Sequence, residues 1–141
     1  MLNKKNISDN NYLSEKMIES YHSTFYYFIN MIEDLSSNTL GKQYFLDIGY
    51  WISEFKCDIL NDVEYLLKED NINLDKSEKE VITNIGLFIF NTPENIFLSN
   101  YIEECDYNYW IYLKCFASVC LISLNKAIEK NRFYYFNNNL L

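Results

Sequence analysis

The stretch Tyr44–Glu69, YFLDIGYWISEFKCDILNDVEYLLKE, carries apolar residues at the three- and four-residue steps of an α-helix. These positions form one apolar stripe: Phe45, Ile48, Ile52, Phe55, Ile59, Val63 and Leu66. An acidic stripe lies beside it, within about a quarter-turn of the helix. Its members are Asp47, Glu54, Asp58 and Asp62, with Trp51 and Tyr65 inside the same sector and Tyr44 at its edge. The pattern predicts an amphipathic helix with one face toward a core and a second face of carboxylates and aromatic rings.

The composition favours an all-α fold. Only three glycines and one proline interrupt 141 residues, whereas an all-β chain of this length needs many more turn residues. With 49% hydrophobic residues, the chain carries too much apolar surface to be disordered. We therefore expect one domain over residues 1–141, a compact bundle of about five helices, with tails at 1–9 and 133–141 that can fray.

Apolar periodicity places the first two helices. The first is expected over roughly residues 10–35. Its apolar stripe consists of Leu13, Met17, Tyr21, Phe25, Phe28, Ile32 and Leu35. The second helix is expected from Asn38 or Thr39 to about Lys68, with room for a break near Gly49. The polar residues 69–76 then read as a loop.

Two start signals predict further helices in the second half. Ser77–Glu80 has the spacing of a capping box, in which a serine hydroxyl and a glutamate satisfy backbone N–H groups reciprocally. Thr92, Pro93 and Glu94 match the start of another helix, which we expect to end near Glu103.

The last helix, expected over about 107–130, is apolar around most of its circumference. This predicts a central helix surrounded by the others. A dimerisation helix is an alternative. A membrane span, which needs about 20 predominantly apolar residues, fits less well because Lys114 and polar neighbours interrupt the segment and flanking charges are missing.

The formal charge of −8 is unevenly distributed along the chain. Residues 47–80 carry −6 and residues 81–106 carry −4, whereas residues 107–141 carry +3. Binding to nucleic-acid phosphates requires clustered lysine and arginine, and Arg132 is the only arginine. The negative field disfavours nucleic acid and anionic membrane surfaces and favours a basic protein as partner. Alternatively, the net negative charge serves only to keep a small protein in solution.

The residue types give little support for catalysis, a metal or a cofactor. The four cysteines show no CxxC spacing and the first residues no secretory signal, so we expect free thiols in the cytoplasm. His22 is the only histidine, and with Glu19 it makes one half of the Glu-x-x-His pair of motifs that di-iron bundles require. We expect His22 to be a helix-surface residue. No glycine-rich phosphate loop or nucleophile turn is visible, and we expect no enzyme.

The acidic stripe is thus the best candidate site, and it suggests a small inhibitor of a basic partner such as a nuclease toxin, in the manner of an immunity protein or antitoxin. The carboxylates would pair with lysine or arginine, and the aromatic rings of the stripe would anchor the complex. A secondary acidic patch consists of Glu94, Glu103, Glu104 and Asp106.

Three alternatives stand beside this hypothesis. The 13 tyrosines and 10 phenylalanines suggest a structural or adaptor protein that forms homo-oligomers. Buried carboxylates could serve a metal-binding protein or an enzyme. The acidic stripe also fits a solvated helix face, with Trp51 packed on a neighbouring helix.

Overall fold

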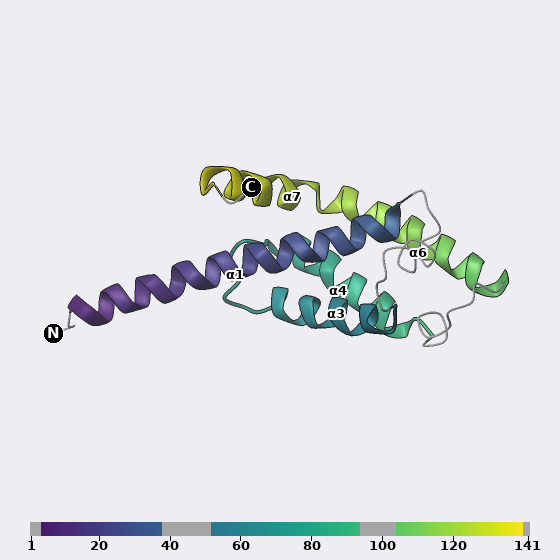
Figure 1. Ribbon diagram of the computed structural model, residues 1–141, viewed down its shortest axis with the longest axis horizontal. Helices are drawn as coiled ribbons and strands as arrows, with labels where there is room; N and C mark the ends of the chain where they lie inside the picture. Colours follow the sequence, from purple (N-terminus) through teal and green to yellow (C-terminus); the bar gives the residue numbers. More distant parts are fainter. Residues whose placement is uncertain (1–3, 38–51, 94–103, 140–141) are drawn as a thin grey trace.

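The computed structural model describes residues 4–37, 52–93 and 104–139, and in these ranges the chain is all-α (Figure 1). The helices are α1 (Lys4–Ser36), α3 (Ile52–Leu66), α4 (Lys76–Asn91), α6 (Glu104–Ser123) and α7 (Asn125–Asn137). This confirms the predicted all-α bundle of about five helices. The expected helix start near residue 39, the break at Gly49 and the helix of residues 93–103 fall largely or wholly outside the described residues.

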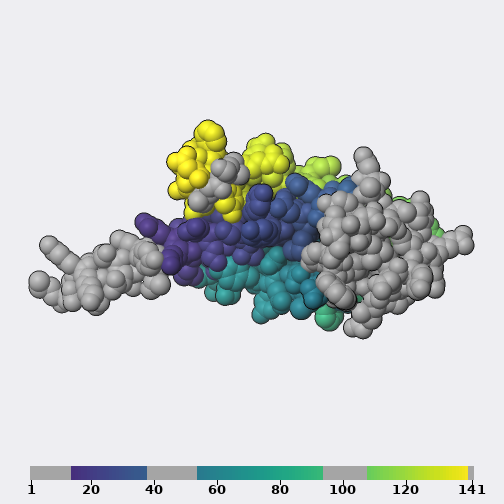
Figure 2. Space-filling model, viewed as in Figure 1, coloured from purple at the N-terminus to yellow at the C-terminus, as the bar shows by residue number. Residues whose placement is uncertain are grey.

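Three of the other described helices pack on the long helix α1. It contacts α3, α6 and α7, and Figure 1 shows α7 on one side of it and α3 on the other. Most of its predicted stripe is buried: Tyr21, Phe25, Phe28, Ile32 and Leu35. Met17 lies toward the free end of the helix and is 41% exposed. In the view of Figure 2, α1 still reaches the surface between α7 and the α3–α4 pair.

The predicted apolar stripe of α3 supplies the other half of the core. Phe55, Ile59 and Leu66 are fully buried against α1 and α4, and Val63 is nearly so. Where α3 meets α4, a Cβ added to Gly86 would lie only 2.8 Å from Val63 Cγ1. The helices therefore approach closely at Gly86, because glycine has no side chain to separate them.

Helix α4 begins at Lys76, and its N-cap lies two residues before the first residue of the predicted capping box. Asp75 is the N-cap: its Oδ1 accepts from the Glu78 N–H at 2.8 Å, and its own N–H donates to Glu78 Oε1 at 2.9 Å. Ser77 Oγ donates to the same Asp75 oxygen. The assignment of Ser77 as the cap is wrong, because Asp75 and Glu78 have the same spacing and a carboxylate accepts a stronger, charge-assisted bond.

The predicted single helix over 107–130 is wrong. The chain bends by 67° at Leu124, between α6 and α7. Hydrogen bonds persist on both sides of the bend, from the Leu124 N–H to Cys120 O and from the Ile128 N–H to Leu124 O, each at 2.9 Å. Neither glycine nor proline marks the bend, and buried Leu124 and Ala127 continue the helical spacing, so the sequence pattern hides it.

The expectation that this segment is central is also wrong, because α6 packs on α1 and α4 but leaves one face exposed. Helical backbone extends into both regions expected to fray, since α1 begins at Lys4 and α7 ends at Asn137. By length and hydropathy, no single helix in the described ranges could cross a membrane; α6 from Asn108 passes that test only jointly with α7, across the bend.

Candidate protein-binding face

Three residues of the predicted acidic stripe lie on successive turns of α3. Glu54 and Asp58 are exposed, and Asp62 is half-buried. Tyr44, Asp47 and Trp51 lie outside the described residues, as do Glu94 and Glu103 of the secondary patch. Glu104 and Asp106 lie in the first turn of α6, but their side chains are outside the described part of the chain.

A groove of about 520 Å³ between α1 and α3 brings part of this stripe together with α1. From α3 it is lined by Asp58, Asn61 and Asp62, and from α1 by Tyr27, Asn30, Met31 and Asp34. We refer to this set of residues as the acidic groove. Three carboxylates, two amides and one exposed aromatic ring thus line one open surface, a donor and acceptor set suited to lysine or arginine side chains.

Asp34 is a groove residue that the sequence did not reveal. It follows Tyr27, Asn30 and Met31 at helical three- and four-residue spacing, which gives α1 a polar edge beside its core stripe. Nothing in that spacing tells which neighbouring helix the edge faces. Only the packing of α3 against α1 places Asp34 beside Asp58 and Asp62.

Asp62 is a groove residue whose pKa is shifted. Burial raises the pKa of its carboxyl to about 6, and the negative charge of Asp58 adds to the effect. A cation brought to this carboxylate would lower the pKa again and favour the charged form. In the described ranges, no three histidine, cysteine or acidic residues are grouped so as to hold a metal ion.

Tyr65 lies one helical turn beyond the groove and is already engaged by its own chain. Its hydroxyl is 2.7 Å from Ser20 Oγ, its ring centroid is 4.9 Å from that of Tyr21, and Lys68 Nζ lies 4.6 Å from its ring centre. The half-buried ring is therefore held in place rather than fully free. Glu54 and Tyr65 flank the groove instead of lining it.

A second groove, of about 380 Å³, separates α1 from α7. Half of its eight lining residues are apolar or aromatic, and the polar half includes Glu33 as its one acid and Arg132 as its one base. Such a surface lacks the net negative charge of the acidic groove. Asn30 lines both grooves, which places them on either flank of the same stretch of α1.

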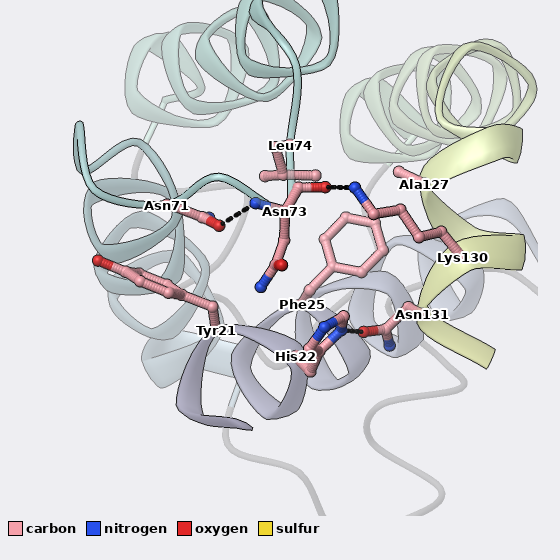
Figure 3. A pocket seen from close by; sticks show the side chains of 9 residues that line it. All are labelled: Tyr21, His22, Phe25, Asn71, Asn73, Leu74, Ala127, Lys130 and Asn131. Atoms are coloured by element: carbon pink, nitrogen blue, oxygen red, sulfur yellow. Dashed lines mark hydrogen bonds between the residues drawn. The ribbon is translucent and has the colours of Figure 1, made fainter. Parts of the chain in front are cut away.

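His22, expected at the surface, is buried where α7 folds back over α1 (Figure 3). Its Nδ1 lies 2.6 Å from Asn131 Oδ1, and its ring stacks on Tyr134 with 3.7 Å between centroids. Burial lowers the pKa of the imidazole, and the nearby charge of Lys130 acts in the same direction, while the hydrogen bond to Asn131 opposes them. The surface assignment is wrong because α7 covers His22. The bend at Leu124 brings α7 to this place, and the sequence of α1 does not indicate that another helix packs there.

The space beside His22 is too small for a substrate. Lys130 Nζ donates to Asn73 O at 2.7 Å, and the Asn73 N–H donates to Asn71 Oδ1 at 3.1 Å. Asn73 Nδ2 is buried without a protein acceptor, beside a cavity of about 10 Å³ (Figure 3). That volume holds about one water molecule. The cluster therefore fastens α7 and the α3–α4 loop to α1 and offers no room for catalysis.

Comparison of the chain with protein-family models, with curated proteins and with solved structures found no match.

Proposed function

We propose that this protein is a small acidic inhibitor that binds one basic partner protein through the acidic groove, in the manner of an immunity protein or antitoxin. The observation that carries the proposal is the convergence of Asp34, Asp58 and Asp62 from two helices on one open groove. A nuclease-type toxin is the partner class that fits best, because its substrate site is cationic. Carboxylates can occupy such a site in place of phosphates.

Charge would act at two stages of binding. The net charge of −8, concentrated in residues 47–106, would steer a basic protein toward this side of the chain and raise the association rate at low salt. In the complex, a lysine or arginine beside Asp62 would compensate for the burial that raises the pKa of this carboxyl. Tyr27, which is 65% exposed in the groove, would supply an aromatic contact.

The test begins with affinity capture from a lysate of the source organism at low and at high salt. We expect one basic protein to be retained at low salt and released at high salt. The purified pair would then be mixed, and the activity of the captured protein should fall in proportion to the inhibitor added, to zero at a fixed stoichiometry. A captured protein whose activity is unaffected would contradict the inhibitor role.

The variant Asp58→Lys/Asp62→Lys should lose the partner while keeping its helical circular dichroism. A matched control, Glu80→Lys/Glu129→Lys, makes the same charge change at exposed positions of α4 and α7. If both variants weaken binding equally, net charge alone is responsible and the groove is not the site.

A further inference from the structure

Helix α6 carries two apolar seams on opposite faces. The buried seam, against α1 and the core, consists of Trp110, Leu113, Ala117 and Cys120, and Leu124 at the bend continues it. A second set repeats this spacing two residues later: Tyr112, Cys115, Val119 and Ile122. Since two residues correspond to about 200° around a helix, the second set points away from the core. We call these four residues the outer seam.

The outer seam is exposed to solvent. Tyr112 is 70% exposed, Val119 61% and Ile122 77%, and Cys115 is an exposed free thiol. Ile111, beside the seam, is 41% exposed. The face of a surface helix opposite the core is ordinarily charged or polar, whereas here three turns in succession present large apolar groups to water.

The outer seam carries no charged side chain, a property that it shares with residues 20–32 of α1 and residues 81–91 of α4. Between Asn108 and Asn125 the only charged residue is Lys114, which is half-buried and lies off the seam. The other long surfaces carry exposed charges, for example Glu15 on α1, Glu54 on α3 and Lys126 on α7. A basic partner would find no carboxylate to pair with on the outer seam, so the seam and the acidic groove call for different partners.

We infer that the outer seam packs against the outer seam of a second copy of this chain, forming a symmetric dimer. Its alternating three- and four-residue spacing is that of helix–helix packing, and the buried seam with the same spacing already packs in this fold. Two chains of charge −8 repel one another over most of their surfaces. A neutral seam within the segment 107–141, which carries +3, is where that repulsion is weakest.

The size of the seam sets the expected strength of the dimer. From Tyr112 to Ile122 it extends about 15 Å along the helix at 1.5 Å per residue. An interface of this extent is at the small end of specific contacts, below about 1,200 Å² in total, where complexes are typically weak and reversible. We therefore expect a monomer–dimer equilibrium in the micromolar range. The inference does not depend on the proposed inhibitor function, because the seam lies on α6 and the acidic groove on α1 and α3.

Sedimentation equilibrium of the full chain at about 5 to 500 μM tests the inference. The apparent mass should rise from monomer to dimer across this range. The variant Val119→Glu/Ile122→Glu places like charges across the symmetric contact and should stay monomeric, with unchanged circular dichroism because both side chains are exposed. The matched control, Leu87→Glu/Phe90→Glu on exposed positions of α4, should dimerise as the wild type does.

Two cysteines give an independent readout in the same samples. Cys115 in the seam and Cys57 on α3 are both exposed free thiols. Alkylation of Cys115, followed by peptide mass spectrometry, should slow several-fold between low and high protein concentration, while alkylation of Cys57 should not change. A wild type that remains monomeric to 500 μM, or a dimer that survives Val119→Glu/Ile122→Glu, would overturn the inference. Binding of a monomer to phosphatidylcholine vesicles through this face would do so as well.

Discussion

His22 Nδ1 on α1 and Asn131 Oδ1 on α7 are 2.6 Å apart, although 109 residues separate them in sequence. Both side chains are buried, and they meet only because the chain turns back at Leu124. This pair joins the first and last helices of the described structure. Because one member of the pair is a titratable histidine, the packing of α7 on α1 can be measured through this hydrogen bond.

Replacing Asn131 by alanine should lower the free energy of unfolding by about 1–3 kcal/mol, because the buried imidazole N–H loses its acceptor. Asn131→Asp should instead retain the hydrogen bond and raise the pKa of His22. Because His22 is the only histidine, its ring protons can be followed by NMR without ambiguity. An unchanged His22 titration in Asn131→Asp would show that the two side chains do not meet in solution.

The burial of His22 also predicts how stability depends on pH. Its pKa in the folded protein is below the ordinary value of about 6.5, so the unfolded chain binds more protons in this range. The contribution of His22 is therefore present above pH of about 6.5 and is lost as the pH falls below it. In a His22→Gln variant, urea unfolding from pH 8 to 5 should lose this component of the pH dependence.

The carboxyl of Asp62 should make stability depend on pH in the opposite direction. Its pKa in the folded protein is about 6, above the ordinary value of 3.8 for an aspartate carboxyl, so the folded state binds more protons between these values. The stability due to this group is present below pH of about 4 and is lost as the pH rises through 6. Asp62→Asn should then raise the free energy of unfolding at pH 7 by about 1 kcal/mol, after allowance for solvent screening of a half-buried group.

The gain in Asp62→Asn should vanish at pH 4, where both side chains are neutral. Thermal unfolding of wild type and variant at pH 7 and pH 4 measures the difference. Asp58→Asn is the matched control, and it should lower the pKa of Asp62 by removing the neighbouring charge. Equal melting temperatures for wild type and Asp62→Asn at pH 7 would argue that this carboxyl is not desolvated.

Gly86→Ala tests the close approach of α3 and α4. The added methyl group would meet Val63 Cγ1 at 2.8 Å, and overpacking of this kind costs about 1–3 kcal/mol. Alanine regains about 1 kcal/mol of helix propensity, which leaves a net loss of about 1 kcal/mol. Denaturant unfolding should also show that Gly86→Ala/Val63→Ala is more stable than the two single changes predict additively. Additive effects would mean that the two residues do not touch.

The sequence predicts Ser77 as the N-cap of α4, whereas the structure has Asp75 in that position. Backbone and side-chain hydrogen bonds, from the Glu78 N–H first and then from Ser77, lower the pKa of Asp75. Asp75→Ala should therefore lower the melting temperature more than Ser77→Ala does, and the difference should shrink as the pH falls and Asp75 is protonated. The reverse order of the two variants would restore Ser77 as the cap.

Sequence periodicity predicted the parts of the fold that depend on one helix at a time. The buried residues Phe28 and Ile32 of α1, and Phe55 and Ile59 of α3, occupy the stripes expected for them. Features that depend on how two helices meet were not predictable in this way. Apolar spacing carries no information on direction, so it passes through Leu124 without showing the 67° bend.

The same distinction applies to the candidate site: features of a single helix were predictable, and features that depend on packing between helices were not. The acidic stripe predicted that Glu54 and Asp58 share one face of α3, whereas their exposure to solvent is known only from the structure. The position of Asp34 in the groove could not be predicted, because it is set by the packing of α3 on α1. The burial of His22 depends on α7 in the same manner, through the distant residue Asn131.

The most direct test of the inhibitor hypothesis is the dissociation constant between the captured basic partner and the wild type, Asp58→Lys/Asp62→Lys and the control Glu80→Lys/Glu129→Lys, measured by titration calorimetry at two salt concentrations. The hypothesis predicts that the groove variant binds at least 100-fold more weakly than the wild type, about 2.7 kcal/mol, while the control changes affinity far less. Equal affinity of the wild type and the groove variant, with both folded, would contradict it.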